Sequence, residues 1–157
     1  MEARGRDLRL SSLRKLAEAL GLPGRGVELA VEYFLRLPAD SIAAASARVL
    51  CDGPDSWKVH LFNFVDAFRA SRDPALIRSA PLERSEARIR SLMASTVEAL
   101  CAECGLVAPE WCSGVGALST PWFVAGRESL KAFALVESPA AFRKRKSFVL
   151  ANFLSRA

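Results

Sequence analysis

Apart from valine, β-branched residues are scarce in this sequence. Its 157 residues include 3 isoleucines and 2 threonines, against 26 alanines and 21 leucines. Isoleucine and threonine favour strands, whereas alanine and leucine are among the best helix formers. We therefore expect an all-α fold: a compact domain of several helices with one very short extended piece near the C-terminus.

Long hydrophobic runs are also missing. The longest stretch without a charged residue, residues 111–126, contains a proline and three glycines, so we expect no membrane-spanning helix. Residues 1–7 are mostly charged and lack the apolar segment of a secretion signal. We expect a cytoplasmic protein, in which the four cysteines do not form disulfides.

The sequence contains no recognisable catalytic motif. Gly21, Gly24 and Gly26 lack the preceding strand and the lysine of a phosphate-binding loop. His60 is the single histidine, and no motif places a nucleophile beside it. We expect a protein that is not an enzyme and that needs no cofactor.

The cysteines form half of a zinc signature. Cys101 and Cys104 are three residues apart, so they share a helix face, and Cys112 follows shortly after. A closed zinc site needs a fourth ligand, which only His60 or Cys51 could supply. A redox pair at this spacing lies at the start of a helix, whereas this pair lies at a predicted helix end. We favour free thiols and no metal, with zinc binding and redox chemistry as alternatives.

Prolines, glycines and capping residues divide the chain into helix-sized pieces. The most regular apolar spacing lies in residues 85–104, which end at Gly105. We expect residues 106–126 to be irregular, Ser12 and Asn152 to cap the first helix and a final turn to residue 156, and residues 147–149 to be extended. Helices or short helical pieces are predicted over 12–20, 25–37, 40–50, 56–68, 73–79, 85–104, 127–136 and 138–145.

The net charge of +5 is unevenly distributed. Both ends of the chain are basic and the middle is mildly acidic, and the densest group of cations is Arg143–Lys146. Such a run is most often a solvated helix end, but it also attracts nucleic acid or an acidic protein surface.

The last third of the chain resembles a bacterial antitoxin-like family. Residues 118–123 read L-S-T-P-W-F, residues 138–149 read S-P-A-A-F-R-K-R-K-S-F-V, and residues 152–157 read N-F-L-S-R-A. The resemblance extends over residues 57–157 and is most specific in the last forty. Residues 9–22 are similar to the last helix of the helix-turn-helix domain that often precedes this region in the family.

This resemblance implies a function. Genes of this family commonly neighbour a nucleotidyltransferase-like toxin, which the antitoxin restrains. The chain would then comprise an N-terminal helical segment, 1–55, and an antitoxin-like helical domain, 56–157, whose partner is the cognate toxin. The residues expected to bind it combine cations with aromatic rings, the side chains that dominate protein interfaces. They are Arg143, Lys144, Arg145, Lys146, Phe148, Trp122 and Phe123.

The alternative is a small transcriptional regulator that binds nucleic acid through its basic ends, with Arg14 and Lys15 as candidate DNA contacts. Whichever partner is bound, the helix expected after Ser138 determines where the four bases of the run point. Arg143 and Lys146, three residues apart, would share one helix face, and one of the four bases would lie over Phe148 or Trp122.

Overall fold

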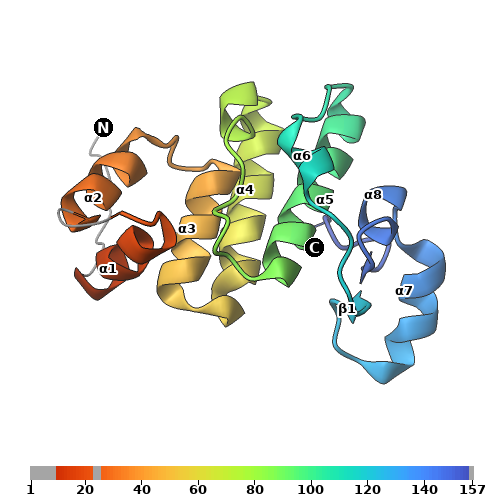
Figure 1. Ribbon diagram of the computed structural model, residues 1–157. Coiled ribbons are helices and arrows are strands. Elements are labelled where there is room, and N and C mark those ends of the chain that lie inside the picture. The colour runs from red at the N-terminus through yellow and green to blue at the C-terminus, as the bar shows by residue number, and fades with distance from the viewer. Residues whose placement is uncertain (1–9, 23–25, 156–157) are drawn as a thin grey trace.

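The computed structural model describes residues 10–22 and 26–155, which fold mainly into α-helices (Figure 1). This confirms the predicted all-α fold. The helices are α1 Leu10–Ala19, α2 Gly26–Arg36, α3 Ile42–Asp52, α4 Trp57–Ser71, α5 Ala87–Cys104, α6 Trp111–Gly114, α7 Lys131–Glu137 and α8 Ala140–Arg143. Three short 3₁₀ turns are η1 Pro54–Ser56, η2 Pro74–Leu76 and η3 Glu128–Leu130. None of the helices in the described part is long and apolar enough to cross a membrane.

Two strands of two residues each, β1 Trp122–Phe123 and β2 Ser147–Phe148, form a parallel ladder. Phe123 pairs with Phe148 in the register. The strand β2 confirms the short extended piece expected near the C-terminus. Its partner β1 and the helix α6 lie in the segment that was expected to be irregular, so that prediction was wrong for these residues.

Local sequence signals explain several helix ends. The Ser41 hydroxyl accepts a hydrogen bond from the Ala44 amide and caps α3. Helix α5 ends at Gly105, whose φ of 67° is the left-handed conformation that glycine adopts without strain. The cap predicted at Ser12 is wrong, because α1 begins at Leu10 and places Ser12 inside the helix. In the last turn Ser155 N–H donates to the Asn152 carbonyl, and the predicted end of that turn at Arg156 lies outside the described residues.

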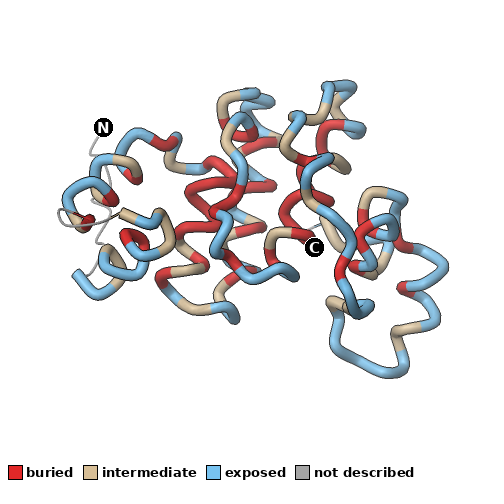
Figure 2. The backbone as a smooth tube through the Cα atoms, viewed as in Figure 1, coloured by how far each residue is buried: buried red, intermediate tan, exposed pale blue. Residues whose placement is uncertain are grey.

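The helices α3, α4 and α5 lie side by side in the centre of the molecule (Figure 1). Helices α1 and α2 pack together at one end, while α7, α8 and the small sheet occupy the other. The inner faces of the three central helices form the largest buried region (Figure 2).

Helix α3 contributes side chains to three hydrophobic clusters, of which two are the larger ones. Its Ile42 and Val49 pack into the main core, which extends to Val149 near the C-terminus. Its Ala47 and Cys51 pack into a smaller core with α1 and α2. The division of the chain at residue 55 stays a prediction, and apolar contacts cross that position.

We expect the main core to dominate stability. Phe68 on α4 is fully buried and stacks on Phe64 at 5.9 Å between ring centroids. Replacing it with alanine leaves a cavity and should lower the free energy of unfolding by about 3–5 kcal/mol in urea denaturation. The matched control is Val59→Ala on the same helix, where the side chain is 59% exposed and the change should stay within about 0.5 kcal/mol. Equal effects at the two positions would contradict this assignment of the core.

Candidate partner-binding surface

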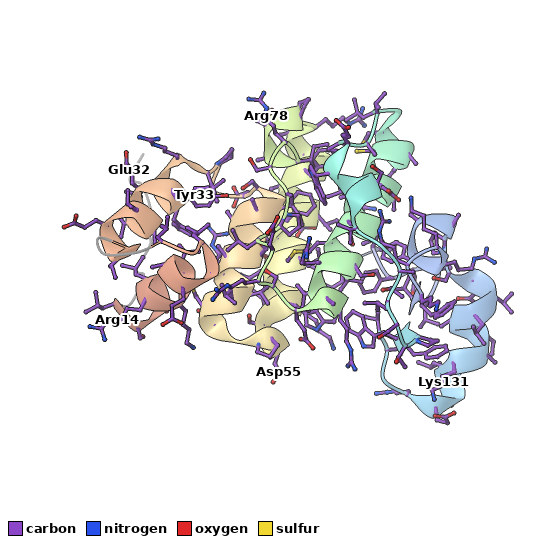
Figure 3. All side chains as sticks on the ribbon, viewed as in Figure 1. Arg14, Glu32, Tyr33, Asp55, Arg78 and Lys131 are labelled. Carbon is purple, nitrogen blue, oxygen red and sulfur yellow. The ribbon has the colours of Figure 1, made fainter. Side chains whose placement is uncertain are left out.

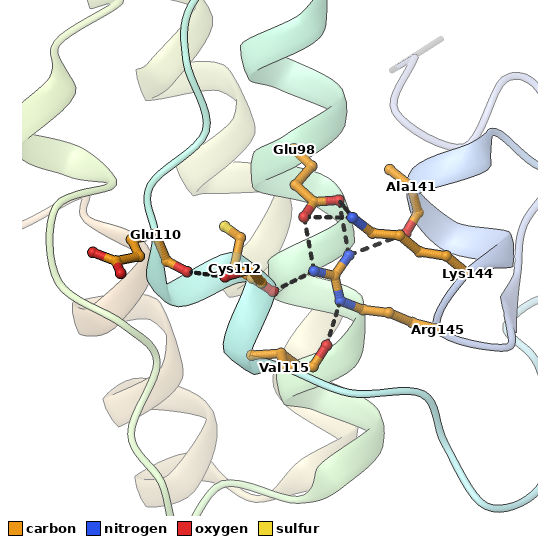
Figure 4. A network of polar contacts seen from close by, with 8 residues as sticks. Glu98, Glu110, Cys112, Val115, Ala141, Lys144 and Arg145 are labelled. Atoms are coloured by element: carbon orange, nitrogen blue, oxygen red, sulfur yellow. Dashed lines mark hydrogen bonds and ion pairs between the residues drawn. The ribbon is translucent and has the colours of Figure 1, made fainter.

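One side chain of the basic run lies inside the protein. Arg145 is 2% exposed, and its Nη1 and Nη2 donate to the two carboxylate oxygens of Glu98 on α5 at 2.9 and 2.8 Å (Figure 4). The other three N–H groups donate to the backbone carbonyls of Cys112, Val115 and Ala141. All five guanidinium donors are therefore used, which is the condition under which a buried charge is tolerated.

This arrangement corrects the prediction that Arg145 binds a partner, because no part of its guanidinium is left for one. Lys144 is tied to the same carboxylate, with its Nζ 2.8 Å from Glu98 Oε1, although its side chain remains 53% exposed. Two of the four cations thus serve the fold of the C-terminal third.

The Glu98 carboxylate is held in its charged form. Desolvation by burial raises the pKa of Glu98, but the hydrogen bonds from Arg145 and Lys144, together with their positive charges, outweigh it. The net result is a pKa below the ordinary value of 4.5. The ion pair is therefore intact at neutral pH.

Arg143 and Lys146 are the exposed half of the run. Within residues 10–22 and 26–155 neither side chain forms an ion pair with a carboxylate. They do not share a helix face as predicted, because α8 ends at Arg143 and Lys146 lies in a turn with a left-handed φ of 56°. That turn reverses the chain into β2.

The three predicted aromatic residues are half-buried and pack on other rings. Phe123 and Phe148 stack across the β1–β2 ladder with centroids 5.1 Å apart, and Trp122 meets Trp57 edge-on at 6.1 Å. The cation over this stack is Lys131 of α7, 5.4 Å from the Phe123 ring. The prediction that a base of the run lies over Phe148 or Trp122 was wrong, because the turn directs those bases elsewhere.

The most exposed apolar side chains of the C-terminal end lie on α7. Phe133, Leu135 and Val136 are 58%, 48% and 78% exposed, while Ala134 is the one fully buried residue of that helix. Sequence reasoning predicted this helix but did not assign its faces. Its sequence, K-A-F-A-L-V-E, places apolar residues on every side of the helix between two charged ends. This pattern is the signal from which exposed apolar side chains could have been predicted.

Three of the four cysteines are buried, and the single histidine pairs with a carboxylate. Cys101 and Cys112 are buried, and burial raises the pKa of Cys112 to about 12, so its thiol stays protonated. His60 pairs with exposed Asp52 at 2.8 Å, with its Nε2 facing the carboxylate. In the part of the chain that the structure describes, no three potential ligands are grouped as a metal site requires.

The two candidate DNA contacts, Arg14 and Lys15, are exposed on α1. Arg14 and Lys131 mark opposite ends of the molecule (Figure 3). The structure therefore does not bring Arg14 and Lys15 into one patch with the C-terminal run.

Comparison with family models, with curated proteins and with solved structures finds no match to this chain.

The Glu98–Arg145 pair should be essential for stability. Glu98→Gln leaves a buried guanidinium without its counter-charge, which costs about 3–5 kcal/mol of unfolding free energy. The matched control is Glu103→Gln, which breaks a pair with Arg69 that is partly exposed on both sides and should cost at most about 1 kcal/mol. Urea denaturation at pH 7 compares the two variants, and similar losses would show that the Glu98 pair is not special.

The same pair predicts how stability depends on pH. Because the pKa of Glu98 is lowered on folding, its contribution is complete above the ordinary value of 4.5 and is lost as the pH falls through the lowered folded-state pKa. Urea midpoints measured from neutral to acidic pH should therefore converge for the wild-type protein and Glu98→Gln at the acidic end. A constant gap between them would contradict the assignment.

Proposed function

We propose that this protein is an antitoxin that neutralises a nucleotidyltransferase-like toxin by direct binding through its C-terminal end. The observation that carries the proposal is a group of exposed apolar side chains on α7, accompanied by two cations that have no carboxylate partner among the described residues. Phe133, Leu135 and Val136 are exposed on α7, and Arg143 and Lys146 are exposed at the same end of the molecule.

Both parts of this surface have a physical role in binding. Exposed apolar groups gain free energy when a partner covers them, and an aromatic anchor such as Phe133 contributes most when it is fully desolvated. Nucleotidyl transfer relies on carboxylates that hold metal ions, so the toxin presents an acidic pocket that exposed arginine and lysine complement. The sequence motifs of residues 118–157 support the same assignment.

The alternative function is a nucleic-acid-binding regulator, and the exposed Arg14 and Lys15 on α1 favour it. Because these cations lie at the other end of the molecule from α7, such binding would use a different surface (Figure 3). If six to ten phosphates were contacted, the affinity would fall by roughly 10³- to 10⁵-fold between about 50 and 200 mM salt.

The test of the antitoxin proposal is a binding titration with the product of the neighbouring gene, which the proposal expects to be a nucleotidyltransferase-like protein. Arg143→Glu combined with Lys146→Glu should weaken binding by at least about tenfold, or ~1.4 kcal/mol, because two attractive charges become repulsive. The melting temperature should be nearly unchanged, since both side chains are exposed and neither has an ion-pair partner among the described residues.

The matched control is Arg84→Glu combined with Arg88→Glu, two exposed arginines near the start of α5. This control should bind like the wild-type protein. A double reversal at 143 and 146 that unfolds the chain, or a wild-type protein that forms no complex at micromolar concentration, would overturn the proposal.

A further inference from the structure

A groove lies where three segments that are distant in sequence meet. The groove has a volume of about 310 Å³ and opens between the first turns of α4, the turn after β1 and the C-terminal segment. This volume is at the small end of the range of about 300–1,000 Å³ that ligand pockets occupy. Its lining is Trp57, Lys58, Phe62, Val124, Ala125, Val149, Leu150, Asn152 and Phe153.

Aromatic rings form the apolar part of this groove. Phe153 contacts two aromatic rings of α4, with centroids 6.3 Å from Trp57 and 5.6 Å from Phe62. Phe142 supports Phe153 from the core side with an edge-on contact at 5.8 Å. Rings held in this way present a surface for another flat ring, since aromatic pairs at 4.5–7 Å add roughly 0.5–1.5 kcal/mol beyond area burial in general.

Two polar side chains line the groove, and neither carries a negative charge. Lys58 contributes an ammonium 5.7 Å from the centre of the Trp57 ring, and Asn152 contributes a side-chain amide. Among the described residues neither side chain has an ion-pair or hydrogen-bond partner, and no carboxylate lines the groove. The lining therefore offers one positive charge, an amide donor and aromatic surface.

We propose that this groove binds a small aromatic carboxylate: a planar ring that packs against Phe153, with a single negative charge facing Lys58. A neutral ring would forgo the ion pair with Lys58, and an aromatic amine would be repelled by it. A dianionic phosphate would lack the several donors that such a group needs. None of the exposed apolar residues of α7 lines this groove, and the proposal does not depend on the antitoxin function.

The experiment uses three probes that share one ring, indole-3-acetate, indole and tryptamine, whose charges differ. Each is titrated to about 10 mM into the full-length ¹⁵N-labelled protein, a range suited to ligands of this size. Indole-3-acetate should shift the Trp57 indole N–H and the Asn152 side-chain amide in the NMR spectrum. It should bind roughly tenfold more tightly than tryptamine, because the interaction with Lys58 changes sign.

Lys58→Glu should reverse that order, so that tryptamine binds more tightly than indole-3-acetate. Lys58 is exposed and unpaired among the described residues, so this variant should fold normally, as its melting temperature would show. The matched control is Lys131→Glu, which removes the other lysine that lies over an aromatic ring and should leave the order unchanged.

Two results would overturn the proposal. The first is the absence of shifts at Trp57 and Asn152 with indole-3-acetate, or shifts confined to other residues. The second is equal binding of all three probes, which would show an apolar crevice without selectivity for charge. Loss of toxin binding in Arg143→Glu/Lys146→Glu affects neither result, so the two proposals fail independently.

Discussion

The C-terminal third of this protein depends on one buried ion pair. Arg145 uses all five of its donors to join Glu98 on α5 to the backbone of α6, α8 and the loop at Val115. Of the elements that it connects, α6 and α8 have four residues each and are too short to persist by themselves. Their conformation therefore comes from tertiary contacts, among which this pair is the most highly connected. A buried hydrogen bond of 2.9 Å between the Ser91 and Ser147 hydroxyls also links α5 to β2.

The ion pair also determines which charges reach the surface. Lys144 and Arg145 turn toward Glu98, while Arg143 and Lys146 remain exposed. The tight turn at Lys146 then starts β2, whose Phe148 stacks on Phe123 under the Lys131 ammonium of α7. Because α7 buries only Ala134 fully, its larger apolar side chains are left outside. The mixed apolar and cationic surface on which the proposed function rests is thus a consequence of how this third of the chain folds.

The N-terminal helices are joined to the rest by shared apolar packing. Helix α3 presents Ile42 and Val49 to the main core and Ala47 to the smaller one. Because α3 packs into both clusters, it holds the two clusters in a fixed relative position. This arrangement keeps Arg14 on α1 far from the C-terminal cations (Figure 3). A partner that contacts both Arg14 and the C-terminal cations would therefore have to extend along the molecule.

Local patterns in the sequence predicted the fold class, the approximate positions of the main helices and several helix ends. These are local properties: alanine and leucine content, apolar periodicity, and the glycine stop at Gly105. The sequence did not predict α6 or β1, because two-residue strands and single-turn helices have almost no local signal. It also could not distinguish Arg145 from Arg143, since both are arginines in one basic run. Only the tertiary structure decided which of them meets Glu98, 47 residues away in the chain, and which faces solvent. Burial and charge pairing depend on what lies opposite a side chain in space, and a local sequence pattern does not contain that information.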